Sequence, residues 1–228
     1  MAGVAEDSCA SGNVIIKDLT PWIMTPWITW IKICAMSSFR PSAAWRQVVR
    51  HPALGRGQRH WLDDQGSLTA RLRARCVQFD VRVLRQQLLR PGIDECATLP
   101  VAPRQLAWGR EVLLLADGVP RIFAHSLLAR AQARGAWRLF ARMGSRPLGA
   151  ALFADPSIVR ESLCFRRLDA RHPLYRAAVQ AAGLDARHTP GLWARRSRFR
   201  RGGHALLVCE VFLPAVYALP APLALSAM

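Results

Sequence analysis

The run from His204 to Pro214, HALLVCEVFLP, constrains the fold more than any other stretch, because both of its faces are apolar if the chain is extended. The residues of the two faces alternate: one carries Leu206, Val208, Glu210 and Phe212, and the other carries Ala205, Leu207, Cys209, Val211 and Leu213. A strand of this kind is covered on both sides. An ionised carboxylate inside it is costly unless a cation, hydrogen-bond donors or protonation compensates it. Glu210 is therefore predicted to have a partner or to contact a ligand.

Turn signals and hydrophobic periodicity predict the neighbouring elements. Two hairpins are expected, one from Leu106 to Ser126 with its turn at Asp117-Gly118, and one from Leu192 to Pro214 with its turn at Gly202-Gly203. Shorter patterns predict further elements: strands at 76–84 and 161–168, helices at 68–75, 136–143 and 173–182, and a turn at 145–149. Because 228 residues have room for one well-filled core, the sequence predicts a single α+β domain.

Arg110 is a second charge set into an apolar strand, on the face that also carries Val112 and Leu114. An arginine in such a place commonly pairs with a carboxylate. Two other interpretations stay open at this point. The guanidinium reaches water at a sheet edge, or it pairs with Glu111 or Glu210 for packing alone.

The net charge of +17 is far from typical, and it fits nucleic acid, an anionic membrane surface or an anionic substrate. Of the 32 basic residues 30 are Arg, and they are scattered without a phosphate-tracking stripe or a nucleic-acid-binding motif. We therefore expect no nucleic-acid partner. The dense run from Arg195 to Arg201 is expected to be mostly a solvated rim of the sheet, with one or two side chains turned inward.

The cysteines, the histidines and the N-terminal apolar run argue against several kinds of site. The six cysteines include no C-x-x-C pair and the six histidines no H-E-x-x-H motif, so no metal site is predicted. Cysteines inside apolar strands fit free thiols and a cytoplasmic protein. The run from Leu19 to Met36 is broken by Pro21, Pro26 and Lys32, so we expect no stable membrane insertion.

The first 36 residues differ in composition from the rest, because they contain both Lys, no Arg and six of the nine Ile. We expect residues 1–36 to be an extension outside the fold, with Met36 as the start of the working protein. The folded domain is then expected at residues 37–217, followed by a C-terminal tail at 218–228.

Four blocks in a fixed order resemble the chorismate pyruvate-lyase (chorismate lyase) family: REVLLLADGVP, then W-x-x-F-x-x-MGSRPLGAALF, then GLWARRSRF, then LLVCEVFLPA. The resemblance extends from Ser42 to Tyr217. It implies an antiparallel sheet packed with helices, with helical flaps over a buried ligand pocket, in an enzyme that uses no cofactor. The implied reaction eliminates pyruvate from chorismate to give 4-hydroxybenzoate, the first committed step towards ubiquinone.

The resemblance also implies site residues, block by block. Arg110 takes the place of an arginine that binds a substrate carboxylate, Leu148 that of a backbone N–H contact, and Glu210 that of a glutamate that contacts the ring hydroxyl or acts as general base. Leu68 takes a further binding position, where better-known members have Met. Arg110 and Glu210 are the implied catalytic residues. Residues 169–190 are an insertion relative to the shortest members, and we expect it at the surface.

One alternative stays open: a protein that binds 4-hydroxybenzoate or another aromatic acid and does not convert it. Turnover of chorismate separates the two functions. In both cases the expected partners are small molecules, and we expect a monomer.

Overall fold

The computed structural model describes residues 45–48, 51–52, 54–102 and 104–222. The predicted extension at 1–36, its Met36 start and the end of the predicted tail at 223–228 lie outside this part of the chain. Within the described residues, no helix is long and apolar enough to cross a membrane. The same residues contain no cluster of His, Cys, Asp or Glu that is suited to hold a metal ion.

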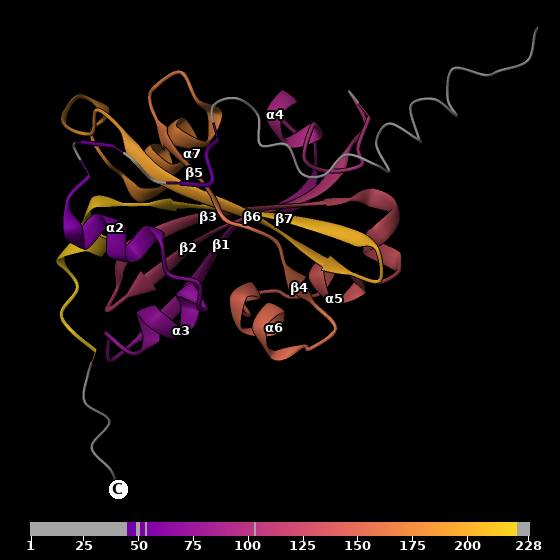
Figure 1. Ribbon diagram of the computed structural model, residues 1–228, viewed down its shortest axis with the longest axis horizontal. Coiled ribbons are helices and arrows are strands. Elements are labelled where there is room, and N and C mark those ends of the chain that lie inside the picture. Colours follow the sequence, from indigo (N-terminus) through magenta and orange to yellow (C-terminus); the bar gives the residue numbers. More distant parts are fainter. Residues whose placement is uncertain (1–44, 49–50, 53, 103, 223–228) are drawn as a thin grey trace, which may run out of the picture. The chain divides into compact units, whose positions relative to one another are not determined.

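Within this part of the chain, seven strands form one antiparallel sheet (Figure 1). Their bounds are β1 Phe79–Leu89, β2 Ala107–Ala116, β3 Val119–Ala129, β4 Val159–Arg160, β5 Cys164–Leu168, β6 Leu192–Arg201 and β7 His204–Phe212. The spatial order is β1-β2-β3-β7-β6-β4, and β5 also pairs with β6. Together with the helices that pack on it, this sheet confirms the predicted α+β class.

Short helices cover both faces of the sheet (Figure 1). Their bounds are α2 Arg56–Leu62, α3 Leu68–Arg73, α4 Ile93–Cys96, α5 Arg138–Ala141, α6 Leu148–Ala154 and α7 Pro173–Ala182, with 3-10 helices at Arg130–Arg134, Ala186–His188 and Pro214–Ala218. Helices α4 and α7 lie on one side of the sheet, which we call the α7 face. Helices α2, α3, α5 and α6 lie on the other side, which we call the α3 face.

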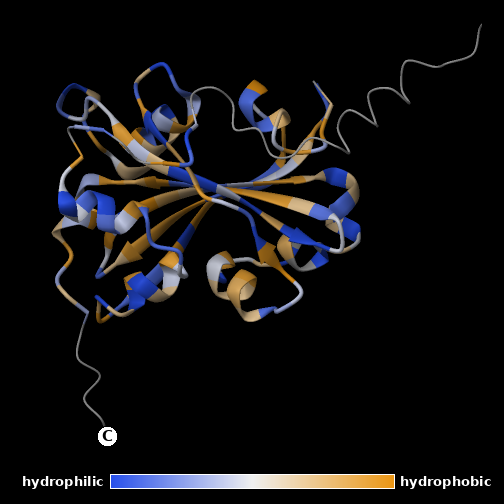
Figure 2. Cartoon of the chain, viewed as in Figure 1, coloured by the Kyte–Doolittle hydropathy of each residue, from blue (hydrophilic) through white to orange (hydrophobic). Residues whose placement is uncertain are grey.

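Strand β7 packs apolar side chains on both of its faces, as the sequence predicts. One set of alternate residues joins the core of the α7 face, and the other joins two clusters under the α3 face: Ala205, Leu207, Cys209 and Val211 in the first set, and Leu206, Val208 and Phe212 in the second. Figure 2 shows hydrophobic residues along much of the central strands. Glu210 is the charged exception, and its side chain is 20% exposed on the α3 face.

Both predicted hairpins are confirmed, as is the predicted helix α7. Strands β2 and β3 meet at Asp117-Gly118, and β6 and β7 meet at Gly202-Gly203, where every turn residue has a positive φ. Helix α7 keeps its predicted bounds and ends at Gly183, which adopts the left-handed conformation that favours glycine.

The predicted strand at 76–84 lies later in the chain than expected. Strand β1 runs from Phe79 to Leu89 at the edge of the sheet, so Val77 is 92% exposed and Val83 is partly exposed. The half-buried alternation predicted for this strand is therefore wrong over much of its length. An edge strand with an uncovered face does not need the packing that its sequence pattern suggests.

The segment between β3 and β5 also differs from its prediction. The helix predicted at 136–143 shrinks to the four residues of α5, and the turn predicted at 145–149 is shorter because α6 begins at Leu148. The intervening loop is held in a non-helical form. Gly144 has a φ of 52°, and its carbonyl accepts a hydrogen bond from a side chain of the sheet, Arg110.

Residues 169–190 lie largely at the surface, as expected, but one side of the segment is also part of the core. They include α7, whose Leu174, Tyr175 and Ala178 are buried in the core of the α7 face. The Tyr175 hydroxyl donates a hydrogen bond to the backbone oxygen of Thr189, which closes the segment on itself. This segment therefore supplies a layer of the fold.

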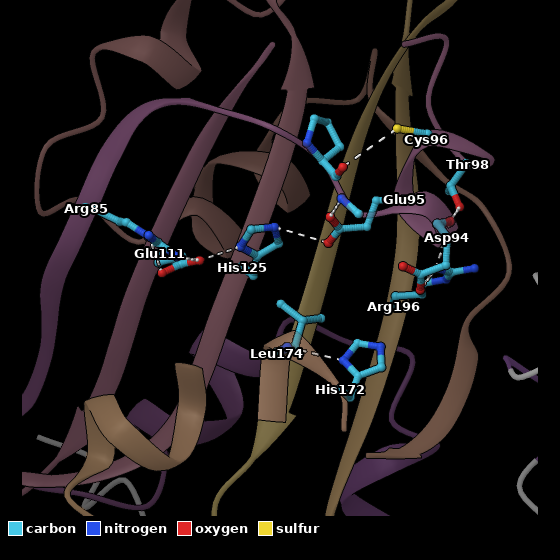
Figure 3. Close-up of polar contacts among 12 residues, drawn as sticks. Arg85, Asp94, Glu95, Cys96, Thr98, Glu111, His125, His172, Leu174 and Arg196 are labelled. Carbon is cyan, nitrogen blue, oxygen red and sulfur yellow. Dashed lines mark hydrogen bonds and ion pairs between the residues drawn. The ribbon is translucent and has the colours of Figure 1, made fainter. Parts of the chain in front are cut away.

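A chain of charged side chains lies on the α7 face, between α4 and strands β1, β2 and β3, and all of its members except Arg85 are buried (Figure 3). The His125 ring lies between two carboxylates, with Nδ1 3.0 Å from Glu111 Oε1 and Nε2 3.2 Å from Glu95 Oε1. Arg85 on the edge strand binds Glu111 through two hydrogen bonds of 2.6 and 2.8 Å. This chain connects α4 to the sheet through ion pairs.

Burial disfavours the charged form of His125 and of Glu111, but their contacts with opposite charges outweigh it. The two carboxylates raise the pKa of His125 to about 9. His125 and Arg85 lower the pKa of Glu111 to about 2. A histidine whose pKa is higher in the folded protein than in the unfolded chain stabilises the fold fully at pH values below its pKa in the unfolded chain. This stabilisation is lost as the pH rises through its pKa in the folded protein. A lowered glutamate pKa contributes above the unfolded pKa, and its contribution is lost as the pH falls.

The free energy of unfolding, measured by urea denaturation, is expected to be greatest between pH 4.5 and 6.5, the unfolded pKa values of Glu111 and His125, and to fall on both sides. The variant His125→Gln is expected to lose the decline between pH 6.5 and about 9, because Gln does not titrate. The control His188→Gln removes an exposed histidine and should keep that decline. A decline of normal size in His125→Gln would contradict this assignment.

Candidate active site

A pocket lies on the α3 face, and its floor is one side of four neighbouring strands, β2, β3, β7 and β6. The strand register fixes where its charged groups stand. Arg110 on β2 lies opposite Ser126 on β3, and Glu210 on β7 lies in the next row of the same face, opposite Ala124. Arg110 and Glu210 are thus two strand spacings apart, or about 10 Å across the sheet.

Two short helices, α3 and α6, cover the pocket, in agreement with the helical flaps that the resemblance implies. Ser67 caps α3, because its hydroxyl accepts a hydrogen bond from the N–H of Ala70 at 3.3 Å, and Leu68 follows as a buried pocket residue. Helix α6 comes so close that a Cβ on Gly149 would lie 2.8 Å from Thr69 Oγ1. Under this cover, the centre of a water molecule can occupy a volume of about 40 Å³ without overlapping the protein. The cavity therefore has room for only a few waters.

The four residues implied by the resemblance all line this pocket: Arg110, Leu148, Glu210 and Leu68. They come from β2, α6, β7 and α3, which are far apart in the sequence. The fold therefore brings together every position that the sequence analysis selected.

Arg110 is only 2% exposed, which excludes the edge position that its sequence left open. Its Nη2 donates hydrogen bonds to the backbone oxygens of Gly144 and Arg146, at 2.9 and 3.1 Å. The interpretation that Arg110 pairs with Glu111 or Glu210 for packing is also wrong, because those two carboxylates pair with other cations. In the described part of the chain, Arg110 Nε is buried without a hydrogen-bond partner, and burial lowers the pKa of Arg110. A buried guanidinium with a free donor is suited to bind an anion.

Glu210 has the cation partner that its apolar surroundings require. Arg195 lies directly opposite on β6, and its Nε is 2.5 Å from Glu210 Oε2. Arg195 Nη1 also donates a hydrogen bond of 2.7 Å to the backbone oxygen of Asp64, in the loop between α2 and α3. The Glu210 side chain still lines the pocket, so its carboxylate is available to a ligand.

The inward side chains that were expected in the run from Arg195 to Arg201 are those of Arg195 and Arg196. Arg195 and Arg196 point to opposite faces of the sheet, and each is 1% exposed. On the α7 face, Arg196 Nη1 lies 3.2 Å from Asp94 Oδ2. Arg200 is exposed, as predicted. The two inward arginines were not identified individually, because the carboxylates that compensate them come from other parts of the chain.

Arg160 on β4 is a further cation of the pocket, and the sequence analysis missed it. Its Nη2 donates hydrogen bonds to the backbone oxygen and to the side-chain Oε1 of Gln65, the latter at 2.8 Å. Its guanidinium also lies over the ring of Phe153, 5.2 Å from the centroid. Burial and the nearby charge of Arg195 lower the pKa of Arg160. With three arginines against one carboxylate, the pocket lining suits an anionic ligand.

The family model and the curated relatives agree on one family. The family model described as chorismate lyase matches residues 40–220. A probable chorismate pyruvate-lyase of Aromatoleum aromaticum is 52% identical over 179 residues, which cover 78% of this chain and 96% of the relative. One of Thiobacillus denitrificans is 51% identical over 158 residues, which cover 69% of this chain and 83% of the relative.

Among solved structures, the similarity is more distant. The C-terminal domain of the histidine utilization repressor from Pseudomonas syringae is 10% identical, with a TM-score of 0.48 over 64% of this chain and 99% of that one. The match of the family model over most of the chain, with relatives at about half identity, is decisive. This chain belongs to the chorismate lyase family.

Proposed function

We propose that this protein is a chorismate pyruvate-lyase, which eliminates pyruvate from chorismate and leaves 4-hydroxybenzoate, in the cytoplasm and as the first committed step towards ubiquinone. The observation that carries the proposal is that Arg110, Leu148 and Glu210, from three separate blocks of the sequence, line one pocket. The excess of positive charge in that pocket supports it, because chorismate is a dianion. The names of the relatives support it too.

Arg110 and the first residue of α6 hold one carboxylate of the substrate. The free Nε of Arg110 and the N–H of Leu148 are donors at the pocket, and N–H groups in a first helical turn have no partner inside their helix. Two fixed donors on one carboxylate restrict the position of the ring. Arg110 also binds the carbonyls of Gly144 and Arg146, so it positions the loop that leads to Leu148.

The chemistry of the elimination places modest demands on the enzyme, because the product ring is aromatic. The bond between the ring carbon and the ether oxygen breaks, and the oxygen keeps the electron pair. The ring carbon that bears the hydroxyl loses its hydrogen, and the enolpyruvyl carbon gains one to give pyruvate. No net oxidation or reduction occurs. The pocket therefore acts mainly by holding the side chain in a reactive conformer and by excluding water.

Glu210 acts at the opposite end of the ring from Arg110. The two residues stand about 10 Å apart across the sheet, on opposite sides of the space that the ring occupies. Glu210 either accepts a hydrogen bond from the ring hydroxyl or removes the proton from the ring carbon. Arg195, at 2.5 Å, fixes the orientation of the carboxylate for either role.

The purified protein is expected to release pyruvate from chorismate, which a coupled lactate dehydrogenase assay measures. Arg110→Ala is expected to lower kcat/KM by about 10²- to 10³-fold, because a preorganised donor to the substrate is lost. Arg82→Ala, which removes an exposed arginine from β1, is the control and should retain activity. Tight binding of 4-hydroxybenzoate without any release of pyruvate would favour the carrier instead.

The variant Glu210→Gln separates the two roles of Glu210, because Gln keeps a hydrogen-bond acceptor but takes no proton. If Glu210 is the base, kcat is expected to fall by about 10²- to 10⁴-fold. Binding of 4-hydroxybenzoate, measured by calorimetry, should then change little. A kcat near that of the wild type rules out the base role. Equal losses of activity and of product binding indicate instead that the ion pair with Arg195 is needed to keep the pocket intact.

A further inference from the structure

The pocket holds more positive charge than its own residues neutralise. Arg195 is paired with Glu210 at 2.5 Å. In the described part of the chain, Arg110 and Arg160 form no ion pair, and their hydrogen-bond acceptors are backbone and amide oxygens. Two guanidiniums of the pocket therefore lack a carboxylate in direct contact, although Arg160 is attracted at longer range by Glu210 and Asp64. A buried or half-buried cation without one favours binding of an anion from outside.

Arg160 stands at the junction of the two covering helices. It lies on β4, opposite Phe199 of β6, and thus on the far side of the pocket from Arg110. Its hydrogen bonds reach Gln65, just before α3, and its guanidinium lies over Phe153 of α6. Gln65 offers neutral oxygens only, so a carboxylate that enters the pocket is a stronger acceptor for this guanidinium.

The position of the two arginines fits a ligand with an anionic group at each end. Strands β3, β7 and β6 separate β2 from β4, so the backbones of Arg110 and Arg160 are about 19 Å apart at the usual strand spacing. Both side chains line the same pocket. A dianion whose carboxylates lie on different parts of the molecule contacts both, whereas a monoanion contacts one.

We propose that Arg160 binds the second carboxylate of the substrate, the one on the enolpyruvyl side chain, and so distinguishes the dianionic substrate from the aromatic product. This inference rests on the proposed function. Breaking the ether bond transfers that carboxylate to pyruvate, and the remaining aromatic acid has only the carboxylate held by Arg110. Arg160 thus contributes to binding the substrate and not to retaining the product.

The variant Arg160→Gln tests this assignment through two constants. The KM for chorismate is expected to rise by about 10- to 100-fold, which is the loss of one charge-assisted hydrogen-bonded contact. The inhibition constant of 4-hydroxybenzoate is expected to stay within about threefold of the wild-type value, because the product lacks the second carboxylate. Arg110→Gln is the matched comparison, and it should weaken both ligands.

Two further variants distinguish binding from a structural role. Gln65→Ala removes a side-chain partner of Arg160 but leaves its charge, so the KM for chorismate should stay near normal. Arg160→Lys keeps the charge and should recover part of the lost affinity, and it replaces Arg160→Gln as the test if that variant does not fold.

The results that overturn the inference are distinct from failure of the proposed function. If the wild-type protein releases no pyruvate from chorismate, the proposed function fails, and this inference fails with it. If the wild-type protein is active but Arg160→Gln leaves the KM for chorismate unchanged, only this inference fails. Equal weakening of chorismate and 4-hydroxybenzoate in Arg160→Gln also overturns it, because Arg160 would then support the pocket as a whole.

Discussion

The ion pair between Arg195 and Glu210 connects the sheet, the cover and the pocket. The two residues lie opposite each other on β6 and β7, so the strand register brings Arg195 Nε to 2.5 Å from the carboxylate. Each residue compensates the other, since removing one partner of such a pair leaves an uncompensated charge in apolar surroundings. Arg195 also donates to the backbone oxygen of Asp64, which lies in the loop before α3. The floor of the pocket and part of its cover therefore depend on one contact.

Strand alternation allows neighbouring residues to serve two separate charged systems. Arg110 faces the pocket, whereas Glu111 faces the α7 side and pairs with His125. Arg195 and Arg196 divide between the two faces in the same way. The ion pairs on the α7 face restrain β2, β3 and β6 from behind the pocket. This restraint favours a fixed geometry of the groups that meet the ligand, which preorganised electrostatic sites require.

The sequence predicted those parts of the site whose signal is local. Arg110 and Glu210 stand out because each is a charge in an otherwise apolar strand. Their roles in the site, and the choice of Leu148 and Leu68, come from the family resemblance. Neither Arg160 nor Arg195 stands out in the sequence, because their roles depend on Gln65 and Glu210, which only strand register and loop packing bring near. The seven residues of α6 are too few to show a helical period, so the sequence pattern predicts a turn where this helix begins. The exposure of β1 could not be predicted either, because it follows from the position of this strand at the edge of the sheet, and that position depends on how all the strands pair.

The narrow cavity implies that the cover moves when ligands enter and leave. A space of about 40 Å³ for water centres is too small for an aromatic acid. The floor is held by continuous ladders between β2, β3, β7 and β6, whereas the cover is held by side chains. Thr69 rests against Gly149, and Arg160 connects Gln65 to the ring of Phe153. When α3 and α6 separate, the side-chain contacts of the cover break and the backbone ladders of the floor stay intact, because breaking the side-chain contacts costs fewer hydrogen bonds. Since Arg160 connects the loop before α3 with α6, the residue proposed to bind the second carboxylate also lies between the two helices that cover the pocket.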